Sequence, residues 1–109
     1  MSDWPIRIRV GILFTNLLKV FGPEHIRAHK HCSKHRLEIE RSKGCACFYC
    51  SQRFEPREIE EWTDEGSTAM CPRCEIDSVI GSASGYVLSD AFLQRMHNYW
   101  FERSYKIKV

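Results

Sequence analysis

The sequence of 109 residues contains no apolar run close to the roughly 20 residues that a membrane-spanning helix needs. Glycine and proline are few, at six and four residues, which excludes collagen-like and low-complexity chains. Its first residues lack a charged lead, an apolar block and a small-residue cleavage site, so we expect no secretory signal. Neither sign of charge dominates, since the formal net charge is +2. We therefore expect one soluble domain over residues 1–109, because a compact domain holds roughly 100–150 residues.

Charge is distributed unevenly along the chain. Residues 1–44 carry nine Lys and Arg against four Asp and Glu, and residues 45–80 carry three against eight. Residues 81–109 return to a weakly basic balance of four against two. Two interpretations remain open: the oppositely charged parts pack on each other, or they form two surfaces for different partners.

The cysteines carry the strongest signal. Cys47 and Cys50 form one Cys-x-x-Cys pair, Cys71 and Cys74 form a second, and 20 residues separate Cys50 from Cys71. This spacing is typical of a four-cysteine zinc site. Two residues between ligands let the backbone turn so that both thiolates face one ion, and a hairpin-sized segment brings in the second pair. The sequence therefore predicts one structural zinc ion per chain.

Alternatives to this zinc site remain open at the level of sequence. An iron–sulfur cluster also takes four thiolates, and disulfides would need an oxidising compartment. Cys45 stands two residues before Cys47 and could replace it as a ligand. We expect Cys47 to be the ligand and Cys45 to be a buried neighbour of the metal. Cys32 is predicted to be a small core residue.

The basic front half, residues 1–44, is predicted to be mostly helical. Residues 5–10 alternate as a short strand, residues 12–21 suit a helix that could also begin at Ile6, and a second helix is expected from Pro23 to about Ser42. The second helix carries four histidines, spaced as two pairs four residues apart: His25, His29, His31 and His35. Each pair could face one metal ion, but a solvated polar face is the favoured interpretation, because the sequence supplies no third ligand.

The rest of the chain divides into a metal segment and a helix. In residues 45–81 we expect Phe54 in the core, a helix over 55–62, a turn over 63–67 and a strand over 68–70. Ile76, Val79 and Ile80 should pack under the metal, before a loop over 81–85. The acidic side chains should be solvated: Glu58, Glu60, Glu61, Asp64 and Glu65.

The C-terminal helix is predicted over residues 88–103. Ser89 suits its N-cap and Leu93 can pack against the preceding Leu88. Its apolar face, expected to be the main core element, comprises Phe92, Leu93, Met96, Tyr99 and Trp100. A tail over 104–109 follows.

The predicted class is α+β: a small zinc-ribbon or knuckle module with two Cys-x-x-Cys knuckles and short strands, packed against two or three helices.

Several motifs together resemble a known family: Cys47-Phe48-Tyr49-Cys50, Trp62, Cys71-Pro72-Arg73-Cys74, residues 76–81 and Met96-His97-Asn98-Tyr99-Trp100-Phe101. Over roughly residues 35–101 the chain resembles small, uncharacterised bacterial proteins of the cytoplasm. The resemblance implies a cytoplasmic zinc-ribbon-like protein and no particular activity. Glu75 departs from the usual knuckle, where glycine often follows the second cysteine and adopts a positive φ.

These observations favour a protein-binding or regulatory module without catalysis. Four protein thiolates fill the tetrahedron of zinc and leave no position for a reactive water. No histidine lies between the two knuckles, as a zinc nuclease of the His-Asn-His kind would need, and no His-x-Glu precedes them as in zinc deaminases. The expected partner is another protein or a second copy of the chain, and not a membrane. The alternative is a nucleic-acid-binding ribbon that uses the basic front half: Arg27, Lys30, Lys34, Arg36, Arg41 and Lys43.

Overall fold

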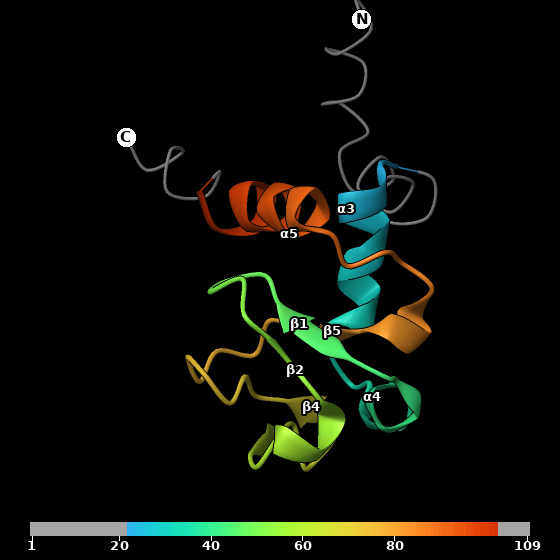
Figure 1. The fold of residues 1–109 in the computed structure, drawn as a ribbon, viewed down its shortest axis with the longest axis vertical. Helices are drawn as coiled ribbons and strands as arrows, with labels where there is room; N and C mark the ends of the chain where they lie inside the picture. The colour runs from blue at the N-terminus through green and yellow to red at the C-terminus, as the bar shows by residue number, and fades with distance from the viewer. Residues whose placement is uncertain (1–21, 103–109) are drawn as a thin grey trace, which may run out of the picture.

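The computed structural model describes residues 22–102, and its elements are all short (Figure 1). The helices are α3 (Glu24–Arg27), α4 (Arg36–Arg41) and α5 (Asp90–His97). The strands are β1 (Cys45–Cys47), β2 (Arg53–Phe54), β3 (Trp62–Thr63), β4 (Thr68–Ala69) and β5 (Val79–Gly81). The class is α+β, as predicted. The strand predicted over 5–10, the helix over 12–21 and the tail over 104–109 lie outside the described residues.

A three-stranded antiparallel sheet, ordered β2-β1-β5, divides the described part of the chain into two cores. Successive side chains of a strand point to opposite faces. Cys45 and Cys47 of β1 accordingly join a core with Val79 of β5. Ala46 and Ile80 join a second core with α5, so the prediction that Ile80 packs under the metal is wrong. Figure 1 shows α5 on one side of this sheet and β4 on the other. The sheet thus separates a sulfur-rich core from an aromatic one.

Helix α5 anchors the aromatic core, as predicted. The Ser89 side chain accepts a hydrogen bond of 3.1 Å from the backbone N–H of Phe92, which satisfies one of the free donors of the helix start. Phe92, Leu93 and Met96 are buried on one face of the helix. Burial of each such side chain stabilises the fold by roughly 1.5–3 kcal/mol. Beyond His97 the helix continues as a π-helical turn over Asn98–Glu102.

The single helix predicted from Pro23 to about Ser42 is wrong. The structure has α3, a 3₁₀ turn over Ala28–His31, a bend, and only then α4. Lys34 adopts a left-handed φ of 47° in the bend. Contacts distant in sequence hold it there, since the N–H of Lys34 donates to Thr68 Oγ1 and the N–H of His35 donates to the Ser67 carbonyl. These bonds replace the helical ones, so tertiary structure overrides the local helical pattern.

The helix predicted over 55–62 is also wrong, because only Pro56–Glu58 forms a 3₁₀ turn. A reciprocal capping box between Glu55 and Glu58 closes this turn. Trp62 lies instead in the hairpin of β3 and β4, paired with Ala69. The turn predicted over 63–67 is found at 64–67, because Thr63 belongs to β3. The strand predicted at 68–70 is found as β4, one residue shorter.

Gly81 closes the sheet, although the sequence predicted it to open a loop. It is the last residue of β5 and pairs with Cys45. A Cβ at this position would collide with the hydroxyl of Ser42, which lies at the end of α4. The Ser42 hydroxyl donates to the Glu38 carbonyl and accepts from the N–H of Ala83, so it is fixed in place. Glycine is therefore required where α4 crosses the sheet.

Candidate metal centre

Four cysteine sulfurs converge between the end of the sheet and the β3–β4 hairpin. The sulfurs of Cys47, Cys50, Cys71 and Cys74 all lie within 4.8 Å of one another. Within residues 22–102 this is the only group of three or more metal-ligating side chains close enough to share an ion. The sequence predicted these four residues as ligands, and the structure brings all four together.

The first knuckle, residues 47–52, begins as β1 ends. The N–H of Ser51 donates to the Cys47 carbonyl at 2.8 Å, which closes the turn, and Ser51 takes a left-handed φ of 64°. The N–H groups of Tyr49 and Cys50 point at Cys47 Sγ, at 3.3 and 3.5 Å. Backbone donors therefore partly compensate the charge that a thiolate would carry here.

The second knuckle, residues 71–76, repeats this backbone geometry. The N–H of Glu75 donates to the Cys71 carbonyl at 2.9 Å, and Glu75 takes a φ of 65°. The N–H of Arg73 points at Cys71 Sγ at 3.3 Å. Glu75 thus adopts the positive φ that glycine often supplies at this position, so the departure in sequence does not change the turn.

The sulfur arrangement fits a single tetrahedral ion. The contact from Cys47 to Cys74 measures 3.6 Å and that from Cys50 to Cys71 measures 3.8 Å between sulfurs. Sulfurs placed about 2.3 Å from a central zinc ion form a tetrahedron with edges of about 3.8 Å. All six cysteines are free thiols, so no disulfide competes for these side chains. The four cysteines could therefore hold one metal ion.

Electrostatics at the site favour a bound cation. Burial raises the pKa of Cys50 and of Cys74, because a charged thiolate would lose hydration and face neighbouring sulfurs. Burial acts in the same direction on Cys71, but the N–H groups of Cys74 and Arg73 outweigh it and lower the pKa of Cys71. Four thiolates this close repel one another, and a divalent cation at their centre removes that repulsion.

The two remaining cysteines lie outside the cluster. Cys45 is buried in the sulfur-rich core beside Cys47, as expected for a neighbour of the metal, and burial raises its pKa to about 12. Cys32 is 4% exposed in the aromatic core, and its thiol donates to the Ala28 carbonyl. The prediction that Cys32 is a small core residue is confirmed.

Among the described residues, the four histidines of the front half belong to no group of three or more metal-ligating side chains. They also do not form one solvated face, because His35 is only 5% exposed. Its Nδ1 donates to the His31 carbonyl, and its Nε2 accepts from the N–H of Ala69. Burial lowers the pKa of His35, which keeps the ring neutral and able to accept this bond. The ring of His29 stacks on Trp100, with centroids 3.9 Å apart.

Sequence analysis missed Ser78 as a part of the site. Ser78 is 2% exposed, and its hydroxyl lies 3.1 Å from Cys47 Sγ. Its carbonyl accepts from the N–H of Phe48, so one residue supports two atoms of the first knuckle. A polar residue just before the apolar pair Val79 and Ile80 was the only signal, and serine at such a position is too common to be informative.

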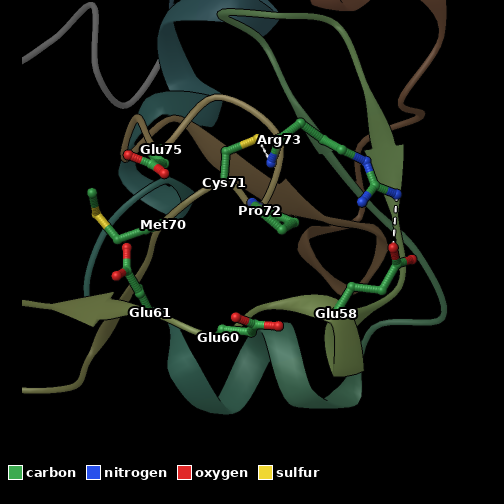
Figure 2. Close-up of a pocket in the computed structure, with 8 residues that line it drawn as sticks. All are labelled: Glu58, Glu60, Glu61, Met70, Cys71, Pro72, Arg73 and Glu75. Carbon is green, nitrogen blue, oxygen red and sulfur yellow. Dashed lines mark hydrogen bonds and ion pairs between the residues drawn. The ribbon is translucent and has the colours of Figure 1, made fainter.

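Acidic side chains surround a hollow of about 370 Å³ beside the second knuckle (Figure 2). Figure 2 shows Glu60 and Glu61 across the hollow from Pro72, and the ion pair between Glu58 and Arg73 at its rim. This pair spans 2.7 Å. The hydrogen bond from the Glu55 N–H and the Arg73 guanidinium lower the pKa of Glu58. Solvation of these acidic side chains, expected from the sequence, holds for Glu60 and Glu61, which are exposed.

Two further hollows lie away from the sulfur cluster. An apolar groove of about 560 Å³ is lined by residues from the sheet and from the segment before α5: Gly44, Cys45, Arg53, Phe54, Glu55, Ser82, Tyr86, Val87 and Leu88. A basic groove of about 460 Å³ contains four of the six cations predicted to contact nucleic acid: Lys30, Lys34, Arg36 and Arg41. The other two, Arg27 and Lys43, are not among the residues that line it.

Comparison of the chain with models of known protein families, with curated proteins and with solved structures found no match. The likeness to small bacterial zinc-ribbon proteins therefore stays a prediction. Among residues 22–102, no helix has both the length and the apolar character that crossing a membrane requires.

Proposed function

We propose that this chain is a zinc-stabilised module that binds another protein and performs no catalysis. The apolar groove at the end of the three-stranded sheet is the observation that carries the proposal. Val87 on its wall is 77% exposed, so the groove presents a large aliphatic side chain to solvent beside other apolar groups. A groove of this kind with a charged rim is typical of sites that receive apolar side chains of a partner.

The compactness of the sulfur cluster supports zinc as the ion. One ion fits within sulfurs that all lie within 4.8 Å of one another, whereas a cluster of several irons and sulfides would spread its ligands. Four protein thiolates complete the coordination of zinc, and Cys47 and Cys71 are buried. A closed site of this type stabilises the fold and offers no position for a substrate. Free thiols also suit a reducing compartment such as the cytoplasm.

Native mass spectrometry with elemental analysis tests the ion directly on protein purified without added metal. We expect one zinc ion per chain. Iron, a second metal ion per chain, or a mass lower by four hydrogens from two disulfides would each contradict this part of the proposal.

The proposed occupant of the apolar groove is an extended segment of a partner protein. Strand β2 lies at the edge of its sheet and pairs only with β1 among the described strands. An extended segment can hydrogen-bond to such an edge and place an alternate side chain into the neighbouring groove. Phe54 and Cys45 give the groove an apolar lining. At the rim, Arg53 already pairs with Asp90 at 2.9 Å.

A peptide selection tests this occupant. A random peptide library is panned on the full zinc-loaded chain, and selected peptides are measured by fluorescence anisotropy. We expect peptides with a central aliphatic or aromatic residue, and we expect Val87→Glu to weaken them at least about tenfold. Leu37→Glu is the matched control, since Leu37 is 72% exposed on α4, away from the groove.

Two results would contradict the proposed occupant. Peptides that bind Val87→Glu as well as they bind the unchanged protein would show that the groove is not the site. A dimer that Val87→Glu dissociates in sedimentation experiments would show that a second copy of the chain occupies it.

A further inference from the structure

The basic groove lies between the 3₁₀ turn over Ala28–His31 and helix α4, and the β3–β4 hairpin contributes Ser67 at its border. Figure 1 shows α4 beside the lower end of the helical segment that begins with α3. The groove encloses about 460 Å³. Its cations come from three positions in the chain: Lys30 from the turn, Lys34 from the bend, and Arg36 and Arg41 from α4.

Most of this positive charge is not neutralised. The one acidic residue that lines the groove, Glu38, is held by His31, whose Nδ1 lies 2.9 Å from its carboxylate. Arg36 forms an exposed pair with Glu40. Within residues 22–102 no acidic side chain forms an ion pair with Lys30, Lys34 or Arg41. The groove therefore attracts anions.

The backbone of Lys34 and the guanidinium of Arg36 are held in place before any ligand arrives. Lys34 sits at a left-handed φ of 47°, which is uncommon for a residue other than glycine, and its N–H is bound to Thr68 Oγ1 at 2.7 Å. The guanidinium of Arg36 lies 4.3 Å from the centroid of the Trp62 ring and donates to the Gly66 carbonyl. Such preorganisation reduces the ordering cost that binding incurs.

The groove also contains an exposed apolar group. Leu37 is 72% exposed and lies between the two arginines of α4 in sequence. Ser33 and Ser67 line the same groove. A sugar–phosphate chain matches this mixture, because its phosphates take cations, its hydroxyls take polar groups, and its sugars and bases can contact an aliphatic side chain.

We propose that this groove binds the backbone of a single-stranded nucleic acid. Arg36 and Arg41 are the first and last residues of α4, and Lys30 and Lys34 precede them in the chain, so the charges are spread along the groove. Charges spread in this way suit a repeating anion better than a single phosphate. The recessed shape suits a flexible single strand, which can enter it, better than a flat bilayer or a rigid duplex, which would meet only its rim.

The proposal is tested by fluorescence anisotropy of the full zinc-loaded chain with labelled 12-nucleotide oligo-dT and oligo-rU, from low to moderate salt. Four cations on phosphates predict a slope of about −3 for the logarithm of the association constant against the logarithm of the salt concentration. The double variant Lys34→Gln/Arg41→Gln should weaken binding about tenfold or more at low salt and reduce the magnitude of the slope by about 1.4.

A charge-matched control separates the groove from general attraction. Arg57→Gln/Arg95→Gln removes the same two charges from exposed positions outside the groove and should leave most of the affinity. The melting temperature and the zinc content should not change in either variant, because none of these side chains contacts the knuckles.

Three results would overturn the proposal. The first is no salt-dependent binding of either oligonucleotide, and the second is equal weakening in both double variants. The third is groove-dependent binding of a phosphoserine peptide, or of vesicles containing phosphatidylserine, in the absence of oligonucleotide binding. The Val87→Glu peptide experiment concerns a different surface, so either proposal can fail without the other.

Discussion

The two knuckles share one backbone geometry but are supported in different ways. Each places a residue other than glycine at a left-handed φ directly after its second cysteine, at 64° for Ser51 and 65° for Glu75. In the first knuckle, Phe48 is 2% exposed in the aromatic core, and His97 Nδ1 donates to its carbonyl. At the equivalent position of the second knuckle, Pro72 borders the acidic hollow. At this position the same turn is therefore packed into a core in the first knuckle and lies at the surface in the second.

Loss of the metal should have the largest effect on stability. It should unfold both knuckles and so remove the difference in how they are supported. Cys50→Ser and Cys74→Ser, one from each knuckle, should both abolish metal binding and unfold at least residues 45–80. Structural zinc contributes apparent binding free energies of about 10–16 kcal/mol, comparable with the whole stability of a small domain, which is about 5–15 kcal/mol. Elemental analysis and thermal unfolding followed by circular dichroism measure both effects.

Removal of a cysteine outside the cluster is the control for that experiment. Cys32→Ala should keep the metal and a cooperative transition, because Cys32 lies in the aromatic core. A native melting temperature in Cys50→Ser or Cys74→Ser, or retention of the fold in excess chelator, would show that the packing of the two cores is sufficient without an ion.

Truncation of the second residue of each knuckle should reveal the difference most clearly. Phe48→Ala should destabilise the zinc-loaded protein by about 3–5 kcal/mol, since it leaves a cavity among Phe92, Leu93 and Met96. Pro72→Ala should cost less than about 1 kcal/mol, because Pro72 is only half-buried. Urea denaturation at fixed zinc concentration gives both values. Similar costs would mean that packing supports both knuckles alike.

The smallest effect should come from glycine at the left-handed positions, where the two knuckles should behave alike. A left-handed conformation costs an ordinary residue about 1–2 kcal/mol, and the greater freedom of glycine in the unfolded chain offsets about 0.4–1 kcal/mol of that. Ser51→Gly and Glu75→Gly should each stabilise the protein by up to about 1 kcal/mol. The measurement is urea denaturation with Ser51→Ala and Glu75→Ala as controls. Destabilisation by either glycine would show that its side chain contributes more than its strain costs.

Local patterns in the sequence predicted much of the metal centre. The spacing of Cys47, Cys50, Cys71 and Cys74 is itself the geometric requirement of one ion, so the residues that converge could be named in advance. Ser89 and the face of α5 followed the same logic, because capping and helical periodicity act over a few residues. Phe54, predicted as a core residue, is 5% exposed.

Features that depend on distant contacts could not be predicted. Residues 23–42 have the pattern of a helix, but hydrogen bonds from Lys34 and His35 to the β3–β4 hairpin are available only once the chain has folded. Residues 55–62 likewise suit a helix locally, yet Trp62 pairs with Ala69 instead. Gly81 reads as a loop residue, and its position in β5 is explained only by the Ser42 hydroxyl that packs against it.

The hydrogen bonds between the bend and the hairpin bear on whether the metal segment could be transferred to another protein. A fragment from Cys45 to Gly81 would keep all four thiolates. It would lose the imidazole of His35 that accepts from the N–H of Ala69, and the N–H of His35 that donates to the Ser67 carbonyl. The hairpin that leads to Cys71 would then expose backbone groups that the intact chain satisfies. The metal segment therefore should not fold as an independent unit when it is transferred alone. A transferred fragment that keeps its fold would have to include the bend with Lys34 and His35.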